Sequence, residues 1–286
     1  MNGLLIVNKE KDYTSRDIVN IISKTLKTKK VGHTGTLDPL ATGVLVVTVG
    51  EATKVSELLT ATYKEYIAEV ILGLNTDTLD ITGTILEEKE SIKTKEEIEK
   101  VLMEMIGTYL QEVPLYSAVK VNGKKLYEYA RNEEEVILPK KEVTIKNLEL
   151  LNYKVENNKT IFQIKCLVSK GTYIRSLIRD IAYKLNTIGV MSNLNRIKQG
   201  KFTLNQSYTI DQIKKGDFQL IKIEDALDIK VIEIDSNMAS KIQNGQIIDN
   251  NYETETILFK KEVPLAIYHI YPKNPKKLKP WKMFHS

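Results

Sequence analysis

A glycine-rich loop of this sequence presents one carboxylate just ahead of a run rich in β-branched residues. Residues 32–43 read G-H-T-G-T-L-D-P-L-A-T-G, and the β-branched run at 44–49 follows directly. The glycines match neither G-x-G-x-x-G nor G-x-x-x-x-G-K-[ST], so the spacing gives little support to nucleotide binding. The group that remains for chemistry is the carboxylate of Asp38, which could act as a nucleophile or a base. The competing interpretation is an Asp-Pro turn in which Asp38 caps a neighbouring amide.

A second cluster lies where a strand is expected to lead into a helix. Residues 169–175 read S-K-G-T-Y-I-R, which places Tyr173 and Arg175 in the first helical turn, near the end of the sheet. From there Arg175 could pair with a buried aspartate, keep it ionised and orient it. Considered alone, an arginine in such a position is more often a surface cation.

A third segment, residues 114–131, interleaves basic and aromatic side chains. Its cations include Lys120, Lys124, Lys125 and Arg131, and three tyrosines lie among them. Such a pattern suits looped or single-stranded RNA, because cations meet phosphates while rings stack on bases. The alternative is an ordinary amphipathic helix with its aromatic residues in the core.

The elements that must position these groups follow from hydrophobic patterning. Residues 64–72 alternate with period two, which predicts a half-buried strand. Thr14 and Thr94 each open an amphipathic helix, and Thr94 with Glu97 forms a capping box. Strands are predicted at 4–7, 44–49, 64–72 and 160–169, and helices from 14, around 52–59, from 94 to 107 and at 173–186. This mixed order, without a regular βαβ rhythm, predicts an α+β fold.

The character of the chain changes after about residue 225. Short strand-like runs separated by turn residues occur at 231–234, 247–248, 256–259 and 264–270, which predicts a small β-rich barrel or sandwich. Residues 272–282 carry five lysines and no acidic residue. We interpret them as a solvated tail, or alternatively as a tail that follows phosphates with Trp281 free to stack.

Composition limits the class of protein. The chain has 286 residues and a formal net charge of +5, and it is 42% hydrophobic and 28% charged, as expected for one large globular domain or a large and a small one. No apolar run approaches the ~20 residues of a membrane span, and the N-terminus lacks a signal-peptide pattern, so a cytoplasmic location is expected. One cysteine and three histidines cannot supply a disulfide or a usual zinc site. Cys166 is predicted to be a buried, inert thiol.

Together these segments resemble the bacterial tRNA pseudouridine-55 synthase (TruB) family. Residues 32–43 match the family's G-H-T-G-T-L-D-P-L-A-T-G segment at every position. Further matches follow in order at 63–66, 72–80, 114–131 and 169–175. The resemblance covers roughly residues 4–210 and is weaker in the C-terminal part.

The resemblance implies a role for each residue of the site. Asp38 would be the aspartate required for isomerisation, and Arg175 would pair with it. Tyr66 would pack against the target base and serve in proton transfer. The residues expected to bind the base or its RNA loop are His33, Lys64, Tyr173 and Leu194, and those expected to bind RNA more widely are Lys120, Lys124, Lys125 and Arg131.

The sequence departs from the family pattern in two places. The family's N-K-P-x-G-x-T-S reads N-K-E-K-D-Y-T-S at residues 8–15, without the proline and the glycine, and its L-R-R run reads L-N-R at 194–196. The first change is expected to make that loop less preorganised. The second removes a cation near the site and is expected to weaken RNA affinity.

The implied reaction breaks the C1′–N1 bond of a uridine, turns the base over and rejoins it through C5. A carboxylate can add to C1′ or C6, or remove a sugar proton, and the sequence does not choose among these routes. The uridine must first be flipped out of its stack, at a cost on the order of a few kcal/mol that basic and aromatic contacts offset. No redox or phosphate chemistry is involved, so neither a cofactor nor a metal is expected.

The sequence therefore predicts an α+β catalytic domain (1–225), with a mixed, mostly antiparallel central sheet of the pseudouridine synthase type, followed by a small β-rich, PUA-like RNA-binding domain (226–286). The predicted function is isomerisation of the T-loop uridine at tRNA position 55, by a monomer that requires no protein partner and no membrane. Two alternatives remain, a tRNA-folding chaperone and a subunit of a guide-RNA-dependent synthase.

Overall fold

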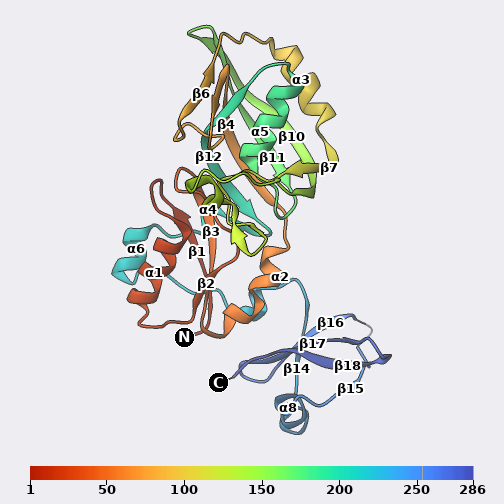
Figure 1. The fold of residues 1–286 in the computed structure, drawn as a ribbon. Coiled ribbons are helices and arrows are strands. Elements are labelled where there is room, and N and C mark those ends of the chain that lie inside the picture. Colours follow the sequence, from red (N-terminus) through yellow and green to blue (C-terminus); the bar gives the residue numbers. More distant parts are fainter. Residues whose placement is uncertain (253, 286) are drawn as a thin grey trace.

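The computed structural model describes residues 1–252 and 254–285, and its largest feature is a nine-stranded sheet (Figure 1). Seven strands lie in the order β1-β3-β12-β4-β11-β10-β7, while β2 pairs with β3 and β13 with β12. Their bounds are β1 (Gly3–Lys9), β2 (Val31–His33), β3 (Thr42–Val49), β4 (Lys64–Leu72), β7 (Gly107–Glu112), β10 (Lys140–Glu156), β11 (Lys159–Val168), β12 (Gly189–Gln199) and β13 (Phe202–Thr203). Among the described residues, each pair in this sheet is antiparallel except β3 with β12. The predicted mixed, mostly antiparallel α+β fold is confirmed.

The two faces of this sheet are covered by different parts of the chain. One face packs under the helices α1 (Ser15–Thr25), α3 (Lys95–Glu104), α5 (Ile174–Lys184) and α6 (Ile210–Lys215). In β1, Leu5 and Val7 belong to that core, whereas Leu4 and Ile6 belong to a second core on the opposite face. Both faces are therefore buried at this end, which explains the continuous apolar runs at 4–7 and 44–49. By contrast, β4 alternates buried and half-buried residues along its length, as predicted.

The predicted helix starts at Thr14 and Thr94 are confirmed. Each threonine side chain accepts a hydrogen bond from the amide three residues on, and Asp17 or Glu97 completes the capping box. The helix predicted around 52–59 is two shorter pieces, the 3-10 helix η1 (Gly50–Val55) and α2 (Ser56–Thr60). Cys166 is fully buried, as predicted, and burial raises the pKa of its thiol to about 12. Within the described part of the chain, no helix is long and apolar enough to cross a membrane.

Two segments project from the large sheet toward the site. One is the hairpin of β5 (Leu74–Thr76) and β6 (Ile85–Glu88), whose connecting residues we call the 77–84 turn. The other joins β7 to β10 and is called the 113–139 insertion. It contains β8 (Lys120–Val121), β9 (Lys124–Lys125) and α4 (Leu126–Arg131), and Figure 1 shows α4 near the middle of the molecule. The alternative interpretation of 114–131 as an ordinary amphipathic helix is therefore wrong for most of the segment, because only Leu126–Arg131 are helical.

The C-terminal residues form a separate five-stranded sheet, in the order β14-β16-β17-β18-β15. Its strands are β14 (Lys230–Glu233), β15 (Ile248–Asp249), β16 (Thr256–Lys260), β17 (Pro264–Tyr271) and β18 (Asn274–Met283). The interpretation of 272–282 as a tail is wrong, because β18 pairs with both β17 and β15 and Leu278 is fully buried. Lysines surround this single deeply buried leucine, which masks the strand in the sequence. The helix α8 (Ser236–Gln243), capped by Asp235, was also not predicted.

The C-terminal sheet packs on the second core of the large sheet. Leu258, Ile267 and Phe284 join that core, next to two short segments, η2 (Leu204–Gln206) and α7 (Ile223–Ala226). Polar contacts centre on Glu51 in η1, whose carboxylate accepts hydrogen bonds from Nζ of Lys54 and from the amide of His285, while its own amide donates to Oδ1 of Asn2. Both ends of the chain thus meet at η1, consistent with the nearby N and C labels in Figure 1.

Candidate active site

An ion pair joins the loop at 32–43 to the start of helix α5. Nε of Arg175 lies 3.0 Å from Oδ2 of Asp38. The arginine side chain is 6% exposed and the aspartate side chain 37% exposed. The structure brings the two residues together, but the expectation of a buried aspartate is wrong. The buried partner is the arginine, and the carboxylate is open to a molecule arriving from solution.

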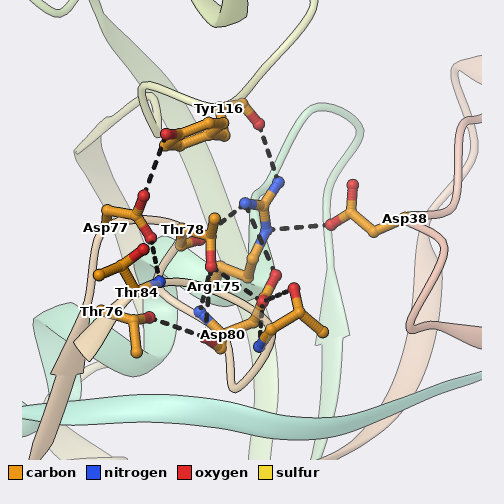
Figure 2. A network of polar contacts seen from close by, with 9 residues as sticks. Asp38, Thr76, Asp77, Thr78, Asp80, Thr84, Tyr116 and Arg175 are labelled. Carbon is orange, nitrogen blue, oxygen red and sulfur yellow. Dashed lines mark hydrogen bonds and ion pairs between the residues drawn. The ribbon is translucent and has the colours of Figure 1, made fainter. Parts of the chain in front are cut away.

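Arg175 also binds two other segments of the chain (Figure 2). Its Nη1 donates to the carbonyl oxygen of Thr78 at 2.7 Å, and its Nη2 donates to the carbonyl oxygen of Tyr116 at 3.1 Å. The carboxylate of Asp80 lies 3.9 Å from Nη1. All three guanidinium nitrogens are therefore engaged, so the group that faces Asp38 is fixed in direction.

The residues on both sides of Asp38 are anchored by the start of the chain. The hydroxyl of Ser15 accepts a hydrogen bond from the amide of Leu37 at 2.9 Å. The carbonyl oxygen of Pro39 accepts from the amide of Asp12 at 2.9 Å and from Nζ of Lys9 at 3.3 Å. The backbone that carries the Asp38 carboxylate is thus held by hydrogen bonds on both sides of this residue.

Lys9 is the main support of the altered loop at 8–15, and sequence reasoning assigned it no role. It is fully buried, and its Nζ donates to the carbonyl oxygens of Glu10 and Tyr13 as well as Pro39. Burial lowers its pKa to about 8, although nearby Asp38 opposes the shift. Residue 12 has a φ of 70°, the left-handed region that favours the glycine of the family pattern. Asp12 adopts it here, so this loop keeps its turn without that glycine.

A cavity of about 460 Å³ opens beside the ion pair. Its walls come from the 32–43 loop, β4, the 113–139 insertion, the start of α5 and β12. The seven residues predicted for catalysis and substrate binding all line it: His33, Asp38, Lys64, Tyr66, Tyr173, Arg175 and Leu194. A volume of this size is typical of a site for a single small molecule or group.

Tyr66 and Arg196 form a buried pair at this cavity. Tyr66 is 6% exposed, and burial raises the pKa of its phenol, while the positive charge of Arg196 acts in the opposite direction. The guanidinium carbon of Arg196 lies 6.0 Å from the Tyr66 ring centre. Arg196 is fully buried, and it donates to the carbonyl oxygens of Val44 at 2.6 Å and Gly35 at 3.0 Å. Sequence reasoning did not assign it, although it ends the L-N-R run.

Lys64 and His33, both predicted to bind the substrate, have distinct environments. Nζ of Lys64 donates to the carbonyl oxygens of Thr60 and Thr62, both at 3.1 Å. Burial, followed by the charge of Arg196, lowers the pKa of Lys64 to about 8. Burial likewise lowers the pKa of His33, whose Nδ1 has no hydrogen-bond partner among the described residues. A neutral imidazole is therefore favoured at this wall of the cavity.

The other two predicted substrate-binding residues supply apolar surface. Leu194 is buried in β12, opposite Ala68 of β4. Tyr173 is half-buried at the N-cap of α5, and burial raises the pKa of its phenol. Their side chains line the cavity together with Tyr66. These groups give the cavity apolar walls beside its single carboxylate.

Asp80 is a third residue of this region to which sequence reasoning assigned no role, after Lys9 and Arg196. It is buried, and its carboxylate accepts hydrogen bonds from the hydroxyls of Thr78 and Thr82 and from the Thr82 amide. It therefore shapes the 77–84 turn whose carbonyl oxygen binds Arg175. The available signal was its place in the matching stretch at 72–80.

The predicted RNA-binding cations cluster over tyrosine rings in the 113–139 insertion. Nζ of Lys124 lies 4.7 Å from the centre of one ring, and Lys125 and Arg131 share another, each at 5.3 Å. Lys120 is exposed. Lys124 also forms an ion pair of 2.6 Å with Glu134, so part of its charge is neutralised within the insertion.

The arrangement provides a fixed cation, an accessible carboxylate and a neutral phenol around one cavity. Such a set can attack or deprotonate a substrate and pass a proton at a second position. Among residues 1–252 and 254–285, no group of three or more His, Cys, Asp or Glu side chains is placed to hold a metal ion.

Comparison with known proteins agrees with this geometry. The family model described as "TruB family pseudouridylate synthase (N terminal domain)" matches residues 23–174. A tRNA pseudouridine synthase B of Caldanaerobacter subterraneus subsp. tengcongensis is 44% identical over 261 residues, covering 91% of this chain and 90% of that protein. The protein of the same name from Limosilactobacillus reuteri is 42% identical over 302 residues, covering 99% of each chain.

Solved structures show the same fold at low sequence identity. A chain in the structure of an H/ACA RNP bound to a substrate RNA containing 2′-deoxyuridine superposes with a TM-score of 0.69 at 21% identity, covering 99% of this chain and 85% of that chain. A chain in the archaeal box H/ACA sRNP Nop10–Cbf5 complex gives a TM-score of 0.68 at 20% identity, covering 99% and 86%. With the matched segment, the identities and the ion pair of Asp38 and Arg175 in view, this chain belongs to the TruB family of pseudouridylate synthases.

Proposed function

We propose that this protein isomerises uridine to pseudouridine in tRNA and that Asp38 carries out the bond rearrangement. The observation that supports this most directly is the 3.0 Å contact between Arg175 and Asp38 at the cavity. The relatives named tRNA pseudouridine synthase B, at 40–44% identity, support tRNA as the substrate class.

The reaction is a rearrangement within one nucleotide. The C1′–N1 bond breaks and a C1′–C5 bond forms, while C5 loses a proton and N1 gains one. Electrons are neither gained nor lost overall, so one carboxylate with a proton acceptor meets the needs of the chemistry. The guanidinium of Arg175 stabilises the negative charge that Asp38 needs to act on the sugar or the base.

The cavity suits a flipped nucleotide. Its volume of about 460 Å³ has room for one base and its sugar, and Tyr66 and Leu194 offer apolar surface to the base. Burial raises the pKa of Tyr66, so its phenol is neutral near pH 7 and can stack while its hydroxyl stays available for proton transfer. His33, Lys64 and Tyr173 complete the walls.

The RNA that reaches this site is proposed to be the T-arm, with the uridine at tRNA position 55 as the target. Lys120, Lys124, Lys125 and Arg131 of the insertion would bind its phosphates. We further propose that residues 1–225 form the catalytic domain and 226–286 a PUA-like RNA-binding domain. In the latter, Trp281 stacks on His269 with ring centres 5.5 Å apart, beside the lysines of β18. The protein would act as a monomer on cytoplasmic tRNA, without a protein partner.

The test is tritium release from a T-arm hairpin labelled with [5-³H]uridine, with no other macromolecule present. We expect release by the wild type and by Asp217→Asn, an exposed control, and none by Asp38→Asn. Hairpin affinity of Asp38→Asn should stay within about threefold, because the carboxylate serves chemistry more than docking. A large loss of affinity with residual turnover would contradict the role of Asp38.

The same assay separates the proposed function from the two alternatives. If the wild type binds the hairpin but releases no tritium, the result would favour a guide-RNA-dependent subunit or a folding chaperone. An Asp38→Asn protein that refolds misfolded tRNA as well as the wild type would show that folding is a separate activity.

A further inference from the structure

One side-chain hydrogen bond joins the 113–139 insertion to the 77–84 turn. The hydroxyl of Tyr116 donates to Oδ2 of Asp77 at 3.0 Å (Figure 2). Tyr116 lines the cavity beside Asp38, and Ser117 and Ala118 continue the same wall. The bond therefore connects a wall of the cavity to a carboxylate that takes no part in the chemistry proposed above.

Asp77 is a rigid anchor for this bond. Its other oxygen, Oδ1, accepts a hydrogen bond from the amide of Thr84 at 2.8 Å, and its own amide donates to the Thr84 carbonyl oxygen at 3.2 Å. A Cβ at Gly83 would lie only 2.3 Å from Oδ1, so the turn closes tightly around this carboxylate. Asp77 is therefore held by its own turn, and it offers Tyr116 an acceptor with a fixed position.

The same turn holds Arg175, so the contacts form a closed ring. Thr78, the next residue after Asp77, accepts from Nη1 of Arg175 at 2.7 Å. Nη2 of Arg175 then donates to the carbonyl oxygen of Tyr116 at 3.1 Å. Tyr116 is thus held at both ends, by Asp77 at its hydroxyl and by Arg175 at its carbonyl oxygen.

We propose that Asp77 is a positioning residue, which acts through Tyr116 to set the cavity wall and the carbonyl oxygen that fixes Arg175 against Asp38. The inference rests on the proposed function, because its consequence is a faster chemical step in that reaction. A bond from a neutral phenol to a carboxylate is charge-assisted and stronger than an ordinary one. In agreement, the hydrogen bond to Asp77 raises the pKa of Tyr116. Holding the wall before RNA arrives removes a rearrangement that would otherwise precede reaction.

A double-mutant cycle tests the proposal. We expect Tyr116→Phe and Asp77→Ala each to lower the single-turnover rate at saturating hairpin about tenfold, with hairpin Kd changed less than about threefold. The double variant should be no slower than either single one, because both remove the same bond. Asp77→Asn should recover part of the rate, since its amide can still donate to the Tyr116 hydroxyl.

A matched control is Tyr153→Phe, which removes a hydroxyl that donates to the Lys93 carbonyl oxygen at 2.9 Å on the far surface of β10. It should react at the wild-type rate. If Asp77→Ala fails to fold, Tyr116→Phe and Asp77→Asn still carry the test, because both keep the shape of the side chain. A wild-type rate for Tyr116→Phe, or additive losses in the double variant, would overturn the proposal.

A spectroscopic titration separates this inference from the proposed function. With ¹³C-labelled tyrosine, the Cζ resonance of Tyr116 reports its pKa, which should fall toward the ordinary value in Asp77→Ala. An unchanged titration overturns the anchoring by Asp77 whatever the turnover. Wild-type protein that shows the titration shift but releases no tritium would instead overturn the function on which the positioning role depends.

Discussion

The side-chain amide of Gln111 makes two hydrogen bonds to the backbone of Tyr173. Its Oε1 accepts from the amide of Tyr173 at 2.8 Å, and its Nε2 donates to the Tyr173 carbonyl oxygen at 3.2 Å. Tyr173 is the N-cap of α5 and makes no capping hydrogen bond with its own side chain, while the buried Gln111 of β7 holds its backbone. The start of α5, and with it Arg175, is therefore positioned by an edge strand of the sheet.

Replacing Gln111 by Met should loosen this helix start. We expect Gln111→Met to lower the free energy of unfolding by about 2 kcal/mol, because the amide of Tyr173 loses its acceptor and the Tyr173 carbonyl oxygen keeps only the Leu177 amide. Turnover should also fall, since Arg175 follows two residues later. Urea unfolding and tritium release measure the two effects. Gln163→Met is the control, because Gln163 is half-buried and makes one long contact of 3.3 Å; equal losses in both variants would contradict the role of Gln111.

The buried ammonium of Lys9 should make stability depend on pH above neutrality. Its pKa is about 8 in the folded protein and about 10.5 when unfolded. Between these values the unfolded state binds more protons, so the free energy of unfolding rises with pH through this window. Below pH 8 the Lys9 ammonium is charged in both the folded and the unfolded state, so its burial lowers the free energy of unfolding by the full amount.

Comparison with Lys9→Met isolates this effect, because Lys64, which shifts in the same direction, is present in both proteins. Urea unfolding at pH 7, 8, 9 and 10 should show the wild type gaining stability relative to Lys9→Met as pH rises. A difference that does not change with pH would exclude a depressed pKa for Lys9.

Glu51 should hold the C-terminal sheet to the large one. Burial raises the pKa of its carboxyl, but hydrogen bonds from Lys54, the His285 amide and Lys30 outweigh burial and bring the pKa to about 2. The stabilisation is therefore complete above pH 4.5 and is lost as the pH falls toward 2. Glu51→Gln should lower the free energy of unfolding by roughly 2 kcal/mol at pH 7.

Hydrogen exchange of residues 254–285 should accelerate in Glu51→Gln. Glu57→Gln is a matched control, because Glu57 also contacts the C-terminal sheet, through Lys282 at 2.6 Å, but its side chain is 58% exposed. An exposed pair contributes about 1 kcal/mol at most, so exchange should change little there. Equal acceleration in both variants would mean that either carboxylate holds the C-terminal sheet equally well, which would contradict the specific role of Glu51.

The cations of the insertion should determine the salt dependence of RNA binding. Lys120→Ala, Lys125→Ala and Arg131→Ala should each weaken hairpin affinity and reduce the slope of log K against log salt by about 1. Lys124→Ala should have a smaller effect, because Glu134 already neutralises part of its charge. Binding measured at several KCl concentrations checks this, with Lys100→Ala on α3 as the control. An unchanged slope in the first three variants would place the RNA elsewhere.

Local sequence determined much of the architecture. The helix starts at Thr14 and Thr94, the alternation along β4 and the apolar runs of β1 and β3 depend on neighbouring residues, so patterning alone predicts them. The loop carrying Asp38 was likewise evident, because its twelve residues form one continuous segment. Patterning failed at β18, where the lysines around Leu278 suggested a tail and only pairing with β17 and β15 makes a strand.

Tertiary structure decided which groups surround that carboxylate. Arg175 meets the Thr78 carbonyl oxygen across 97 residues, and Arg196 meets that of Val44 across 152. These partners are backbone carbonyl oxygens. Every residue has one, so the sequence does not indicate which of them will bind a given arginine. Burial of Arg175, Arg196 and Lys9 depends on such acceptors, because a cation can leave water only where fixed dipoles replace its hydration. The sequence by itself indicated Asp38 as the residue proposed to react, whereas the folding of distant segments onto one another decided the charges and carbonyl groups that hold it in place.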